Sequence, residues 1–161
     1  MKKTQEKQIP TYHLFIDFRQ AYDTPNRDEL YRAMNHFGIP SKLINLSQMT
    51  LQDTWSCVKA AEGVSEQFQT LRGFRQGDAL SCSFFNILLE MIMRAAEIDT
   101  KNMITNKSTQ ILGYADDIEV VRITTSSVAS VFQRLEKEAR TRGLGVKSSR
   151  IIGPNLHHCR L

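Results

Sequence analysis

Residues 111–123 read ILGYADDIEVVRI, and this stretch decides the fold. Two short apolar segments, 111–114 and 118–123, flank a tight turn at Ala115-Asp116-Asp117, a pattern that predicts a β-hairpin. An aspartate pair in a turn is usually turn chemistry, because Asp side chains bond to nearby backbone groups. At the bend of an apolar hairpin, the same pair also presents two carboxylates to a cation.

A third carboxylate interrupts an apolar segment near the N-terminus. Residues 12–18 read YHLFIDF, a run of strand length that contains Asp17. An uncompensated buried carboxylate is unfavourable, so Asp17 requires a partner or a metal ion, unless it is a cap at the strand end. Because carboxylates repel one another unless a cation lies between them, we expect Asp17, Asp116 and Asp117 to meet around Mg²⁺. Sequence spacing alone does not establish that they meet.

The remaining segments predict four helices and two further strands. Helices are expected at 28–37, from Pro40 or Ser41 with Leu43, Ile44, Leu46 and Met49 inward, from Asp78 or Ser81 to residue 98, and from Thr125 or Ser126 to Gly143. Strands are expected at 55–60 and 67–71. This mixture predicts an α+β fold, with helices on one face of a small antiparallel sheet.

Length and composition suit a single globular domain, because the chain has 161 residues, of which 41% are hydrophobic and 24% charged. We expect residues 1–10 to be frayed, 11–152 to form the domain, and 153–161, which include His157-His158-Cys159, to form a tail. No secretory or membrane-spanning segment is evident. Three cysteines without paired spacing favour a reducing, intracellular compartment, either nucleus or cytoplasm.

The positive charge is concentrated in the last quarter of the sequence. Residues 124–161 contain seven Lys and Arg against two acidic residues, whereas the rest contains fourteen against fifteen. Such an excess predicts either a surface for a polyanion such as nucleic acid or simply a solvated helix face.

Four ordered motifs give the sequence its most specific feature. They are FIDFRQAYD (15–23), GFRQGDALSCSFFNILLE (73–90), YADD (114–117) and GLGVKSSR (143–150). Together they resemble the palm motifs of reverse transcriptases of non-LTR (LINE-type) retrotransposons, from residue 12 to residue 150. The resemblance implies a polymerase-type palm over residues 11–152, with the fingers and thumb largely missing. It also implies an RNA-directed DNA polymerase that uses an RNA template, a DNA primer and a dNTP, with two Mg²⁺ or Mn²⁺ ions.

The resemblance assigns roles to individual residues. Asp17, Asp116 and Asp117 match the catalytic metal ligands, and Phe18 would offer its backbone carbonyl beside them. Tyr22 matches the aromatic residue beneath the incoming sugar, where a flat ring excludes a 2′-hydroxyl, although it also suits core packing.

Three further residues of the second motif receive possible substrate contacts. Gln76 and Gly77 match the loop itself, although an ordinary helix-entry turn would also explain them. Arg75 is either a contact to phosphate or template or a surface charge.

The sequence also departs from the family pattern. Lys147 and Arg150 stand where the fourth motif usually has asparagine and lysine, and Arg150 would supply charge as a poor proton donor. Because so few residues flank the motifs, we expect the isolated chain to have little polymerase activity. The alternatives are a non-enzymatic remnant that binds nucleic acid and a nucleotide cyclase, although the hairpin typical of such cyclases is absent.

Overall fold

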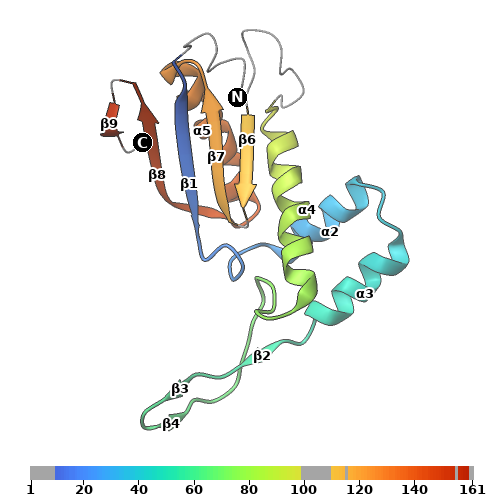
Figure 1. The fold of residues 1–161 in the computed structure, drawn as a ribbon. Helices are drawn as coiled ribbons and strands as arrows, with labels where there is room; N and C mark the ends of the chain where they lie inside the picture. Colours follow the sequence, from blue (N-terminus) through green and yellow to red (C-terminus); the bar gives the residue numbers. More distant parts are fainter. Residues whose placement is uncertain (1–9, 99–109, 115, 155, 160–161) are drawn as a thin grey trace.

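The computed structural model describes residues 10–98, 110–114, 116–154 and 156–159. Its centre is an antiparallel sheet of five strands in the order β6-β7-β1-β8-β9. These strands are β1 (Tyr12–Arg19), β6 (Gln110–Tyr114), β7 (Asp117–Arg122), β8 (Gly145–Gly153) and β9 (Leu156–Cys159). Helices cover one face of the sheet, as Figure 1 shows, so the predicted α+β architecture is confirmed.

Strand β1 lies in the middle of the sheet and separates the two faces. It pairs with β7 on one side and with β8 on the other. Because successive strand residues point to opposite faces, Leu14, Ile16 and Phe18 are buried, whereas Phe15 is exposed and Asp17 is half-buried. The apolar run of the sequence therefore supplies the core on one face and leaves its carboxylate on the other.

Four helices complete the core. They are α2 (Arg27–His36), α3 (Ser41–Leu51), α4 (Ala79–Ala95) and α5 (Thr125–Thr141). Helix α5 packs against β1, β7 and β8, and α4 packs against α5 and α2. Side chains of Asn26, Asp78 and Thr124 accept hydrogen bonds from backbone amides at the starts of α2, α4 and α5, which fixes where these helices begin.

The inward face of α3 differs from the prediction. Ile44 is buried as expected, but Leu43, Leu46 and Met49 are exposed, and Ser47 and Leu51 lie inward instead. The reason is that, among the helices of the described residues, α3 packs against α2 alone and so buries only a narrow stripe.

Residues 55–69 form an extended arm that projects away from the sheet and helices (Figure 1). The predicted strands there are broken into two short ladders, β2 (Trp55–Ser56) with β5 (Phe68–Gln69) and β3 (Lys59–Ala60) with β4 (Gly63–Val64). Trp55, Val58, Val64 and Phe68 remain exposed because no core covers either face of the arm.

Strands β8 and β9 were not among the predicted elements. Strand β8 contains much of the fourth motif, and β9 lies within residues 153–161, which the sequence predicts as a tail. Most of the predicted frayed segment, residues 1–9, lies outside the described residues. Within the described ranges, no helix has both the length and the apolar character needed to cross a membrane.

Candidate active site

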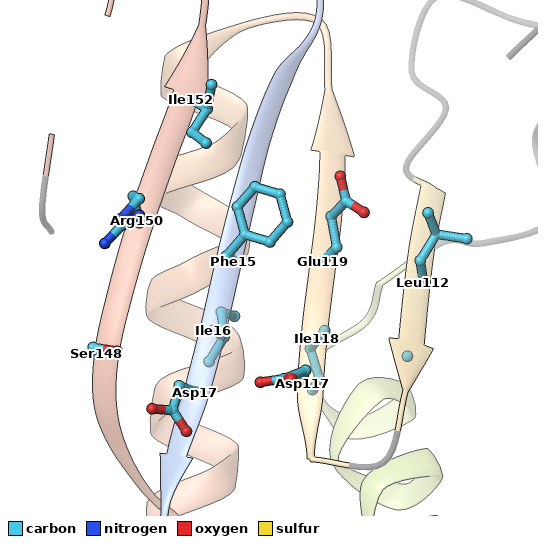
Figure 2. Close-up of a pocket in the computed structure, with 11 residues that line it drawn as sticks. Phe15, Ile16, Asp17, Leu112, Asp117, Ile118, Glu119, Ser148, Arg150 and Ile152 are labelled. Carbon is cyan, nitrogen blue, oxygen red and sulfur yellow. The ribbon is translucent and has the colours of Figure 1, made fainter. Parts of the chain in front are cut away.

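The sheet face opposite the helices carries an open groove of about 530 Å³, which we call the carboxylate groove. Figure 2 shows its side chains standing on four neighbouring strands with α5 behind them. The lining residues are Phe15, Ile16, Asp17, Leu112, Gly113, Asp117, Ile118, Glu119, Ser148, Arg150 and Ile152.

Two of the three predicted carboxylates meet at one end of this groove. Ile16 of β1 pairs with Ile118 of β7, and continuing that antiparallel register by one residue sets Asp17 opposite Asp117. Both side chains line the groove (Figure 2). The hairpin, which the sequence predicts, therefore places Asp117 on the strand next to the one that carries Asp17.

A lysine that the sequence analysis did not connect with Asp17 forms an ion pair with it. The Nζ atom of Lys147, on β8, lies 3.0 Å from Oδ2 of Asp17. From the sequence, Lys147 is only a departure from the family motif. Its ion pair with Asp17 depends on the pairing of β8 with β1, and the sequence does not predict β8. Successive residues of a regular strand point to opposite faces, but Lys147 and Ser148 are both exposed, so β8 is irregular at this point.

The donor set of the groove suits a hard divalent cation. Mg²⁺ is usually held by one or two carboxylates together with water and substrate phosphates, and Asp17 and Asp117 supply such a pair. Within the described part of the chain, no group of three or more His, Cys, Asp or Glu side chains is arranged to hold a metal. The fit is therefore to a cation that takes the rest of its ligands from solvent and substrate.

The third carboxylate, Asp116, is half-buried in the hairpin turn and lies near Tyr22. Burial of the Tyr22 phenol raises its pKa above the ordinary value of 10.0, and the neighbouring Cys82 thiol and the negative charge of Asp116 raise it further. Tyr22 therefore remains a neutral hydrogen-bond donor near the turn at physiological pH.

Tyr22 and Phe18 are held by the same buried ring. The Tyr22 ring lies 5.1 Å from the ring of Phe85 on α4, and the Phe18 ring meets Phe85 edge-on at 6.5 Å. The backbone carbonyl of Tyr22 also accepts a hydrogen bond from the amide of Phe74 at 2.7 Å. Tyr22 is thus fixed in position while part of its surface stays accessible.

Arg75, Gln76 and Gly77 lie away from the carboxylate groove. Arg75 and Gln76 line a second groove, of about 1090 Å³, which we call the arm groove because the arm forms one side of it. Its lining includes Trp55, Phe68 and Phe74 together with Arg27 and Arg72. The Nε2 atom of Gln76 donates to Oδ1 of Asp23 at 3.3 Å, and Gly77 has a φ of +83°, a conformation that favours glycine.

The basic excess at the end of the sequence does not form one uniform surface. Arg134 donates to the backbone carbonyls of Ala96 and Glu97, and Arg142 is buried with an ion pair to Glu138. Arg150 instead lines the carboxylate groove from β8. Arg134 and Arg142 thus hold segments of the fold together, whereas Arg150 lines the groove and Lys147 lies beside it through its ion pair with Asp17.

Residues 1–151 match the family described as "Reverse transcriptase (RNA-dependent DNA polymerase)". Two curated relatives are Retrovirus-related Pol polyproteins. One comes from type-1 retrotransposable element R2 of Popillia japonica, with 26% identity over 83% of this chain and 23% of the relative. The other comes from type-2 retrotransposable element R2DM of Drosophila melanogaster, with 25% identity over 64% of this chain and 10% of the relative. The chain thus spans less than a quarter of either relative, and the matches confirm the resemblance that the four motifs predict.

Solved structures show the same fold. Telomerase from Candida albicans, in complex with a fragment of telomeric RNA, aligns with 97% of this chain and 29% of its own, with a TM-score of 0.77 and 13% identity. Apo telomerase from Candida tropicalis aligns with 94% of this chain and 30% of its own, with a TM-score of 0.75 and 15% identity. At these identities the likeness establishes the palm-type fold.

Proposed function

This chain belongs to the reverse transcriptase (RNA-dependent DNA polymerase) family, and from that premise we propose that residues 11–152 are the palm of an RNA-directed DNA polymerase. The proposed reaction transfers a nucleotide from a dNTP to the 3′-hydroxyl of a DNA primer, as directed by an RNA template. The observation that carries the proposal is that Asp17 and Asp117 line one groove from neighbouring strands. Because the chain covers only part of its relatives, the proposal concerns the share of the reaction that a palm performs.

The carboxylate groove supplies the charges that this reaction requires. Asp17 and Asp117, with Asp116 in the adjoining turn, would hold Mg²⁺ or Mn²⁺ ions together with substrate phosphates. When bound, a pair of such ions stabilises the attacking and leaving oxygens of a phosphoryl transfer. Arg150 lines the same groove and would attract the triphosphate, but a guanidinium stays protonated and therefore does not donate a proton.

Tyr22 would form the floor beneath the incoming sugar. Its ring is fixed against Phe85, so it presents a rigid surface that a 2′-hydroxyl would meet. Phe18 is buried, and its backbone carbonyl would lie beside the metal ligands. Rigid placement of these groups matters because phosphoryl transfer depends mainly on positioning and electrostatic stabilisation.

The arm groove would hold the template side of the substrate. Exposed aromatic rings of Trp55 and Phe68 beside Arg72 and Arg75 combine stacking surfaces with positive charge, as proteins that bind single-stranded nucleic acid do. Gln76 and Gly77 begin the turn into α4 and would lie against the nascent base pair.

Single-nucleotide primer extension tests the proposal. The full chain is incubated with an RNA template, a labelled DNA primer, one dNTP and Mn²⁺ under single-turnover conditions. We expect slow extension by the matching dNTP, reduced about 100-fold or more in Asp17→Asn and Asp117→Asn because metal-assisted charge stabilisation is lost. Asp53→Asn, at an exposed position beyond α3, is the matched control and keeps the wild-type rate. Extension that survives Asp117→Asn would overturn the proposal.

A further inference from the structure

The ion pair between Lys147 and Asp17 places a positive charge at the candidate metal site. The ammonium lies 3.0 Å from Oδ2 of a carboxylate that also lines the groove with Asp117. Each carboxylate oxygen that holds an ammonium is less available to a metal ion, and the two cations repel each other at such short range.

A β-bulge directs Lys147 toward this position. In the pairing of β1 with β8, Asp17 faces Ser148 and Phe18 faces Val146, so Lys147 is an extra residue on β8. Side chains alternate along a regular strand, and since Ser148 lines the groove, a regular β8 would turn Lys147 to the opposite face. The bulge instead leaves Lys147 and Ser148 exposed in succession, as bulges that redirect a side chain next to a site commonly do.

Among the charged groups in and beside the groove, Lys147 is the counter-ion of Asp17. Glu119 is paired with His13, whose Nδ1 atom lies 2.6 Å from Oε1 of the glutamate. Arg150 lines the groove two residues after Ser148 on the same strand, but among the described residues the ion pair of Asp17 is made by Lys147. Lys147 is 63% exposed, so its long side chain has room to move when a stronger cation arrives.

We propose that Lys147 is an internal competitor for the divalent metal ion at Asp17, which weakens metal binding and balances the carboxylate charge while the metal is absent. This inference rests on the proposed function, because it assigns a regulating residue to the same groove. Its consequence is a metal affinity set by β8 as well as by the carboxylates. The chain would then bind its ion readily only when substrate phosphates draw Lys147 away from Asp17 or contribute ligands of their own.

The test measures Mn²⁺ binding directly, through the loss of the free-ion electron paramagnetic resonance signal, with the full chain and no nucleotide. Lys147→Gln removes the charge and keeps much of the side-chain length, and Lys147→Arg keeps the charge. We expect Lys147→Gln to bind Mn²⁺ about five-fold more tightly, which is the order of an exposed ion pair. Lys147→Arg retains the positive charge, so its Mn²⁺ affinity should stay within about two-fold of the wild-type affinity.

Two controls separate this effect from a general change in charge. Lys137→Gln removes the same charge from an exposed position on α5, on the far side of the sheet, and leaves Mn²⁺ binding unchanged. In an Asp17→Asn background, Lys147→Gln no longer tightens binding, because the shared carboxylate is gone.

The outcomes distinguish the two ideas. Equal Mn²⁺ affinity of wild type and Lys147→Gln, with binding still lost in Asp117→Asn, overturns the role of Lys147 and leaves the proposed function standing. If neither Asp17→Asn nor Asp117→Asn changes Mn²⁺ binding, the role of Lys147 and the proposed function are both overturned. The same holds if neither wild type nor Lys147→Gln binds Mn²⁺. A tighter Lys147→Gln variant whose gain depends on Asp17 supports the competition.

Discussion

Asp17 and Asp117 lie one position beyond the Ile16–Ile118 pair of β1 and β7, where continuing the antiparallel register sets the two carboxylates opposite each other. Like charges directly opposite each other on antiparallel strands are destabilising, and here one of the two already takes Lys147 as its counter-ion. The repulsion between Asp17 and Asp117 therefore destabilises the fold at the position where the proposed chemistry requires negative charge.

Asp117→Asn is expected to stabilise the metal-free chain, because it removes the repulsion from Asp17. The gain is about 0.2–1 kcal/mol in the free energy of unfolding, measured by urea denaturation at low ionic strength. It shrinks at high salt because exposed charges are then screened. Glu62→Gln, at an exposed position in the arm, is the control and changes the stability little. A variant less stable than wild type at low salt would contradict this reading of the pair.

Arg27→Ala is expected to destabilise the fold, because the Arg27 guanidinium joins α2 to both ends of the arm. It donates to the backbone carbonyls of Leu51, Thr70, Arg72 and Gly73 and to the hydroxyl of Thr54. The substitution removes these hydrogen bonds, although Thr54 and Thr70 keep those they make to each other. It should cost about 2–4 kcal/mol by urea denaturation.

Arg32→Ala provides the comparison for Arg27. Arg32 lies on the same helix, is 75% exposed and pairs with Glu29 three residues away, so its loss should cost less than about 1 kcal/mol. Similar losses for the two arginines would show that the arm is not held by Arg27. Arg27→Lys is expected to behave like Arg27→Ala, since an ammonium cannot reproduce the planar fork.

Gly73→Ala and Gly77→Ala are expected to differ, although both glycines have positive φ angles. A Cβ at Gly73 would clash with the backbone carbonyl of Asp23, whereas a Cβ at Gly77 would meet nothing within 4 Å. Gly77→Ala should therefore cost about 1–2 kcal/mol for its backbone conformation alone. Gly73→Ala should cost more, because two backbone segments must separate. Equal melting temperatures of the two variants would contradict this contrast.

The titration of Tyr22 is expected to make stability fall at alkaline pH. Burial, then Cys82 and Asp116, raise the pKa of Tyr22 in the folded chain above 10.0. The folded state therefore holds this proton more tightly than the unfolded state does. The resulting stability is fully present below pH 10 and is lost as pH rises from there through the folded pKa.

Comparison with Tyr22→Phe isolates this effect. Tyr31, whose pKa burial also raises, is present in both proteins, so it cancels in the difference. Urea denaturation between pH 8 and pH 11 should show wild type losing stability more steeply than Tyr22→Phe above about pH 10. Parallel curves would mean that the phenol is not held as the structure indicates.

Local pattern was sufficient for the elements that carry their own signals. The apolar strand around Asp17, the helix that begins after Asp78, and the hairpin around Asp116-Asp117 follow from spacing and residue type, and the structure contains them. The α+β class and the family resemblance followed from the same segments.

The remaining features depend on contacts between distant segments. Strand β8 has no uniform alternation, because the bulge at Lys147 shifts its pattern, so its place beside β1 was not apparent. The inward face of α3 depends on a single packing partner, which spacing alone does not reveal. The roles predicted for Tyr22, Arg75, Gln76, Gly77 and Arg150 remain predictions, because they require substrate to be present.

The central position of β1 has a consequence for how the chain folds as it is made. β1 begins at Tyr12, but its neighbours begin only at Asp117 and Gly145. During synthesis, an apolar strand with two unpaired edges must therefore wait until β7 and β8 have left the ribosome, which exposes it to aggregation and to chaperones. Nascent chains that stop before Gly145 should be captured by chaperones through this first strand, and completion of β8 should release them.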